Sequence, residues 1–105
     1  MRAGELQHRV TIQQPARAGS GTGRAVNWQP VARVWAKIQP VRSTDRTAEG
    51  HFQTIRLYRV TIRYQKGLDT KMRVVYGDRT FQISSLVDVD EHHRQLDLLC
   101  EESGG

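Results

Sequence analysis

The stretch Tyr58-Arg59-Val60-Thr61-Ile62-Arg63-Tyr64 sets the fold class, because apolar and polar residues alternate along it without interruption. A period of two places the apolar side chains on one face of an extended strand and the polar side chains on the other. Arg59, Thr61 and Arg63 then form a cationic outer face. The stretch therefore predicts a β-strand that is buried on one side only.

The same alternation recurs along the chain. His8–Gln13 repeats it over a shorter length, and a further strand has Ala32, Val34, Ala36 and Ile38 on its inward face and Arg33, Trp35 and Lys37 on its outward face. Strands are also predicted at 72–76, 79–86 and 95–101, with Gly77-Asp78 as a type II′ hairpin turn. Five or six short antiparallel strands predict an all-β domain, either a small β-barrel or a sandwich.

Two segments break the pattern. Residues 14–27 are rich in Gly, Ser and Ala, and they predict a mobile loop between strands. Residues 41–55 are polar and predict an inserted loop with one short helix, which Ser43 or Thr44 caps and Gly50 ends.

Composition restricts the remaining choices. The chain has 105 residues and a net charge of +5, which predicts one domain over 1–105 with a basic surface. Its apolar runs are far shorter than the ~20 residues that a membrane span needs, and its N-terminus lacks the apolar stretch of a signal peptide. The single cysteine, Cys100, excludes an intrachain disulfide and suits a reducing compartment. We therefore expect that the protein is made in a cytoplasm and that it does not associate with a membrane.

Candidate catalytic and metal-binding residues have simpler interpretations. The run Asp88–His93 resembles a ligand cluster, but adjacent histidines point to opposite sides of an extended chain, and acidic residues between strands are typical of a turn. Ser84 and Ser85 lack a glycine elbow, and Cys100 lies on an apolar strand face. Gly19–Gly23 lacks the lysine of a phosphate-binding loop. The sequence predicts no enzyme, no metal and no cofactor.

Trp35 is the most informative side chain. A large aromatic residue on an outward strand face is either packed under a loop or an anchor at a protein interface, and both alternatives stay open here. Arg59 and Arg63 suit phosphate contacts, but no aromatic residue lies between them to stack a base. This argues against sequence-specific binding of single strands and leaves open a passive contact with duplex DNA.

The order of the blocks resembles the phage head–tail joining proteins, also called head-closure or stopper proteins, of tailed phages and prophages. The blocks are Gly4-Glu5-Leu6, His8–Ile12, Trp28, Val34–Ile38, Arg59–Tyr64, Met72–Ile83 and Arg94–Glu101, and the resemblance covers about 3–102. It implies a small β-barrel that forms a dodecameric ring in the virion neck. The ring lies below the portal and adaptor proteins, closes the DNA channel after packaging and presents a platform to the tail terminator or tail tube proteins.

The resemblance also implies roles for particular residues. The segment 41–55 corresponds to the one that projects towards the channel axis, which brings Arg42, Asp45, Arg46 and Glu49, with the adjacent Arg56, near packaged DNA or a neighbouring subunit. For the contact between subunits of such a ring, the strand pattern itself offers the outward Trp35 as the anchor. It lies between Arg33 and Lys37, and Arg59 and Arg63 are the expected partners for acidic residues of a neighbour. Two alternatives remain: a tail terminator or other neck protein, and a monomeric small-barrel module that binds nucleic acid.

Overall fold

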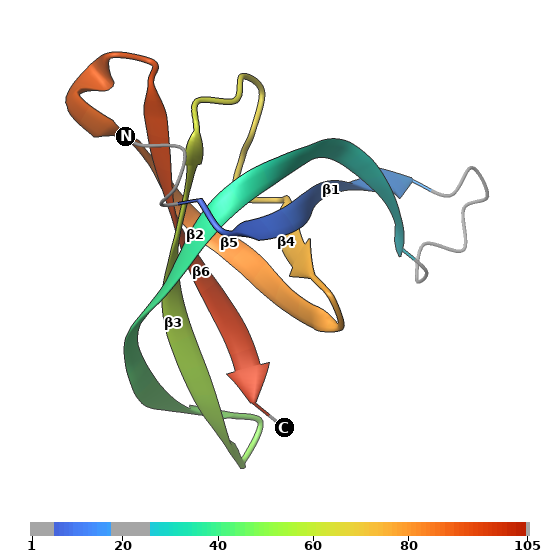
Figure 1. Cartoon of the computed structure of the whole chain (residues 1–105). Coiled ribbons are helices and arrows are strands. Elements are labelled where there is room, and N and C mark those ends of the chain that lie inside the picture. The colour runs from blue at the N-terminus through green and yellow to red at the C-terminus, as the bar shows by residue number, and fades with distance from the viewer. Residues whose placement is uncertain (1–5, 18–25, 105) are drawn as a thin grey trace.

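The computed structural model describes residues 6–17 and 26–104, and they form a closed antiparallel barrel of six strands (Figure 1). The order around the barrel is β1-β2-β3-β6-β5-β4. The strands are β1 His8–Arg17, β2 Val26–Ala48, β3 His51–Arg63, β4 Arg73–Tyr76, β5 Arg79–Asp88 and β6 Gln95–Gly104. The predicted all-β class is confirmed, and the architecture is the barrel. The one helix in the described part is the three-residue 3-10 turn η2 Val89–Glu91, so no helix there has the length to cross a membrane.

The barrel core follows the period of two. Val60 and Ile62 of β3 are fully buried, and they pack with Ile12, Val74, Phe81 and Leu98 from other strands. Arg59 precedes Val60 and Arg63 follows Ile62, and both arginines are exposed. Thr61 departs from the alternation because it is only 6% exposed on the outer side, where its hydroxyl donates to Asp97 at 3.0 Å.

The prediction of a short helix within 41–55 is wrong. β2 continues to Ala48, β3 begins at His51, and the two strands pair with Thr44 opposite Ile55. Glu49 and Gly50 have φ values of 53° and 78°, as a two-residue hairpin turn between right-twisted strands requires. Glycine ends helices and also makes hairpin turns, and the β-branched Thr44 and Thr47 favour the extended form. We call this hairpin the arm: the paired residues Arg42–Ala48 and His51–Leu57 together with the Glu49-Gly50 turn that joins them.

The prediction of a loop at 14–27 is wrong at both ends of the segment. β1 extends through Arg17 and β2 begins at Val26, and the two pair as a ribbon that leaves the barrel (Figure 1). Pro15 is tolerated there because a two-stranded ribbon leaves its nitrogen on a free edge. Trp28, opposite Pro15, lies under the Arg73 guanidinium at 4.0 Å. The remaining residues, 18–25, lie outside the described part.

Two predicted turns are confirmed. Gly77 and Asp78 join β4 to β5 with Tyr76 opposite Arg79, and only Gly77 has a positive φ, as a type II′ turn requires. The run Asp88–His93 connects β5 to β6 through η2. Asp88 accepts a hydrogen bond from the His93 backbone nitrogen at 3.1 Å, which closes this turn.

Candidate functional site

The five residues of the predicted ring interface lie on one outer face of the barrel. Arg33, Trp35 and Lys37 alternate along β2 with residues that point inward, and the β2–β3 register continues the same face onto β3. Gln39 lies opposite Arg59, and Lys37 lies opposite Thr61. The outward residues are Arg33, Trp35, Lys37, Arg59 and Arg63, and we call this set the Trp35 face.

Trp35 is half exposed, and no described loop packs over it. Its indole lies 5.3 Å from the guanidinium of Arg9, the residue opposite Trp35 in the β1–β2 register. Arg9 therefore adds a fifth cation to the Trp35 face, and sequence reasoning missed it. The alternation in His8–Gln13 indicates that Arg9 points outward, but it does not indicate that Arg9 lies opposite Trp35.

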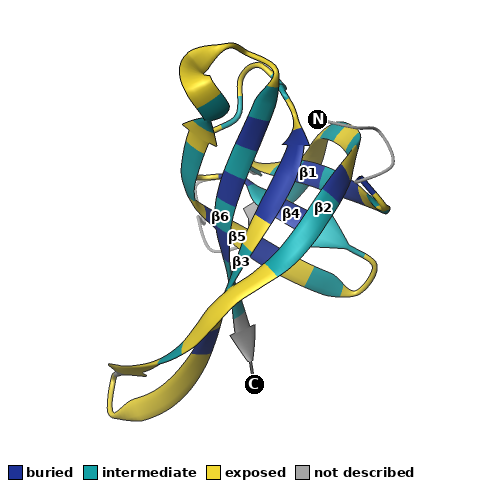
Figure 2. Ribbon diagram, turned by 60° about the vertical axis from the view of Figure 1, so that its left-hand side comes forward, coloured by how far each residue is buried: buried dark blue, intermediate teal, exposed yellow. Residues whose placement is uncertain are grey.

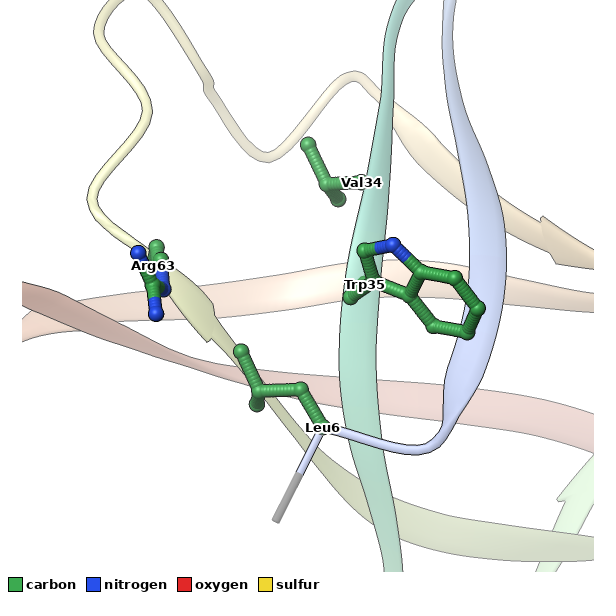
Figure 3. Close-up of a pocket in the computed structure, with 4 residues that line it drawn as sticks. All are labelled: Leu6, Val34, Trp35 and Arg63. Atoms are coloured by element: carbon green, nitrogen blue, oxygen red, sulfur yellow. The ribbon is translucent and has the colours of Figure 1, made fainter. Parts of the chain in front are cut away.

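An open pocket of about 390 Å³ adjoins the Trp35 face, and Leu6, Val34, Trp35 and Arg63 line it (Figure 3). It forms where β2 separates from β3, because their pairing stops at Ala36 and Ile62. Leu6 is only 8% exposed. The lining is apolar except for Arg63, so the pocket suits an apolar side chain that has a carboxylate beside it.

The residues predicted to face the channel all lie on the arm, but β6 partly neutralises their charge. Arg46 forms an ion pair with Glu101 at 2.8 Å, and Arg56 lies opposite Glu102. Asp45 accepts a hydrogen bond from Thr54 at 3.3 Å. Within the described residues, Arg42 has no carboxylate within ion-pair distance. The sequence could not indicate these pairs, because β6 lies about fifty residues away along the chain.

A second ion pair fixes β6 to β5 near the base of the arm. Arg79 donates to both Glu102 carboxylate oxygens, at 2.9 and 3.0 Å, and its guanidinium stacks on the rings of Tyr58 and Phe81. These hydrogen bonds hold the pKa of Glu102 below its usual value of 4.5. The bidentate geometry makes this pair more specific than an ordinary surface ion pair.

We expect Glu102→Gln to reduce the pH dependence of stability in the acid range. Because the folded pKa is lowered, the stabilisation by Glu102 is complete above about pH 4.5 and is lost as the pH falls through the lower folded value. Urea denaturation at several pH values from neutral to about pH 3 checks this result. Glu91→Gln, at an exposed residue of the β5–β6 connection, is the control and should leave the profile unchanged. Equal profiles for wild type and Glu102→Gln would contradict the assignment.

The remaining reactive groups are held in structural roles. Cys100 is buried, and desolvation raises the pKa of its thiol to about 12. Ser84 donates its hydroxyl to the Leu99 carbonyl at 2.9 Å. Across residues 6–17 and 26–104, no three His, Cys, Asp or Glu side chains gather as metal ligands would. The arrangement is suited to contacts between proteins, through the Trp35 face and the arm.

Comparison with known proteins supplies the family and the fold. The family model for the phage head completion protein matches residues 1–103. A chain in the virion of a native gene transfer agent particle has a TM-score of 0.80 at 19% identity, over 94% of this chain and 96% of that chain. A Shigella flexneri 2a protein solved in solution has a TM-score of 0.67 at 24% identity, over 97% and 96%. At these identities the two structures share the fold, and no curated protein matches.

Proposed function

The chain belongs to the phage head completion protein family and is a structural protein associated with the phage head, and from this premise we propose that it forms the closing ring of the virion neck. Copies of the chain assemble as a dodecameric ring below the portal and adaptor proteins. The ring closes the DNA channel after packaging and presents a platform to the tail terminator or tail tube proteins. The protein is made in the cytoplasm of the host bacterium and assembled there.

The arm is the observation that carries this proposal. It extends beyond the closed barrel, and most of its described side chains are exposed (Figure 2). Strand closure leaves the barrel itself without free sheet edges, so a projecting hairpin serves no purpose in its core. In a ring, such arms from all copies reach the channel and occlude it.

The arm is a paired hairpin that β6 connects to the barrel, in place of the inserted loop with a short helix predicted from the sequence. β6 pairs with β3 as far as Thr54 opposite Gly104, and the Arg46–Glu101 ion pair adds a second connection at 2.8 Å. Only the two-stranded tip beyond Asp45 and Thr54 is free of β6. A stem that is fixed in this way supports the proposed gate, because it holds the tip in place against the end of the packaged DNA.

The proposed contact with DNA is passive. Arg46 and Arg56 face Glu101 and Glu102, which leaves Arg42 as the arm cation best able to meet a phosphate. Asp45 and Glu49 are exposed near the tip, where they repel DNA and suit the cations of a neighbouring copy. This balance of charge favours a barrier over a tight nucleic-acid-binding module, which needs many uncompensated cations.

The Trp35 face is the proposed contact between subunits of the neck. A cyclic ring needs a heterologous contact, in which one surface meets a different surface of the next subunit. The half-exposed indole and the adjoining apolar pocket provide an anchor, and Arg33, Lys37, Arg59 and Arg63 surround it with positive charge. These features suit an acidic surface that carries one apolar side chain.

We expect Trp35→Ala to leave the monomer folded and to impair its incorporation below the portal and adaptor. The indole is half exposed, so its loss removes an interface anchor and little of the core. Sedimentation of reconstituted portal–adaptor complexes measures incorporation, and circular dichroism measures folding. Val87→Ala, which truncates another exposed apolar residue, is the control and should assemble normally. Normal incorporation of Trp35→Ala, or its unfolding, would contradict the assigned role.

A further inference from the structure

The two faces of the arm carry different side chains. Residues opposite one another in an antiparallel pair share a face, and successive pairs alternate between faces. The register places Asp45 with Thr54 and Thr47 with Phe52 on one face. The other face holds Arg42 with Leu57, Thr44 with Ile55 and Arg46 with Gln53. We call these the Phe52 face and the Arg46 face.

Phe52 is the most unusual residue of the Phe52 face. Its side chain is 83% exposed, more than any other large apolar residue in the described part of the chain, among which Val87 is next at 55%. It lies two positions after the Glu49-Gly50 turn and past the end of the β3–β6 pairing, and it does not belong to the core cluster that the described residues form. Asp45, four positions before the Glu49-Gly50 turn and on the same face, is also exposed. An exposed aromatic ring at such a place indicates a contact that forms on assembly.

The Arg46 face offers the complementary groups. Arg46 keeps 54% of its side chain exposed although it pairs with Glu101, so the side chain has surface left for a further contact. Arg42, four positions earlier on the same strand and face, is exposed and has no acidic partner among the described residues. An arginine beside an aromatic ring forms a cation–π contact, and an arginine without an acidic partner can form an ion pair with a carboxylate.

We propose that the arms of neighbouring copies stack face to face, with the Phe52 face of one arm against the Arg46 face of the next. Phe52 then covers the guanidinium of Arg46, and Asp45 meets Arg42. The contact is heterologous, so it repeats around a ring and leaves no arm unpaired at closure. The inference rests on the proposed ring, and it adds how the arms hold one another across the channel.

Cysteine cross-linking in assembled necks tests the stacking. Two single variants, Phe52→Cys and Gln53→Cys, place a thiol on opposite faces of the same strand. A ring assembled from a mixture of the two should form intersubunit disulfide dimers under mild oxidation, because a disulfide needs Cβ atoms within roughly 3.5–4.5 Å. A ring of either variant alone should form almost none. Native Cys100 does not interfere, because it is buried and its thiol pKa is raised to about 12.

Three results would overturn the stacking. Dimers in rings of Phe52→Cys alone would mean that the tips meet through identical faces. Dimers between Phe52→Cys and Trp35→Cys would place Phe52 in the pocket beside Trp35. Absence of dimers in every mixture would mean that the arms do not touch, provided that circular dichroism and ring assembly match the wild type. None of these outcomes decides whether the arms close the channel, because truncation of the arm tests that proposal. The stacking and the gate can therefore be refuted independently.

Discussion

Particles whose arm is truncated are expected to package DNA and then lose it. The β2–β3 register shows where the arm can be shortened. Thr44 and Ile55 lie opposite one another, so a two-residue turn can join them directly. Replacing Asp45–Thr54 with Asn-Gly therefore removes the tip and keeps the stem, the buried Ile55 and the barrel. If the tips close the channel, most filled heads should empty after packaging.

The DNA content of purified particles, measured by density gradient and by nuclease protection, checks this result. Replacing only Glu49-Gly50 with Asn-Gly is the matched control, because it changes the turn and keeps the length of the arm. The melting temperature of the truncated protein should stay close to that of wild type, since the described side chains among the removed residues are exposed and a shorter closure costs little. Truncated particles that keep their DNA as well as the control would refute the gate.

Ile62→Ala is expected to cause the largest loss of stability. The side chain is fully buried in the barrel core, and truncating such a residue costs about 2–5 kcal/mol of unfolding free energy through lost burial and the cavity left behind. Arg59→Ala, on the exposed face of the same strand, should change the free energy by less than about 0.5 kcal/mol. Denaturant titration of both variants measures the difference. Similar losses for the two variants would contradict the assigned inward and outward faces of β3.

The fold could be predicted from the sequence because the strand period is local information. The alternation around Val60 and Ile62 identifies an inward face wherever the strand pairs, and the structure buries both residues. The helix expected before Gly50 could not be excluded in the same way. A capping residue, a short polar run and a glycine fit a helix and a hairpin equally well, and only the pairing of β2 with β3 selects the hairpin.

The candidate site, like the fold, could be predicted only where the sequence pattern is local. Trp35 and its neighbouring cations could be placed on one face of β2 from alternation alone. The pocket and the contact with Arg9 depend on where β2 separates from β3 and on the register with β1, and neither is encoded within one segment. The pairing of Arg46 with Glu101 likewise joins residues 55 positions apart. Such long-range contacts decide how much of the arm's charge is free.

A reconstruction of the assembled neck would show whether this chain forms the closing ring. We expect a closed ring of this chain below the portal and adaptor, with Glu49 and Phe52 as the residues of each copy that lie nearest the channel axis. The Trp35 face should be covered by another subunit. A ring in which the arms point away from the axis, or a neck in which this chain occupies no ring, would contradict the account.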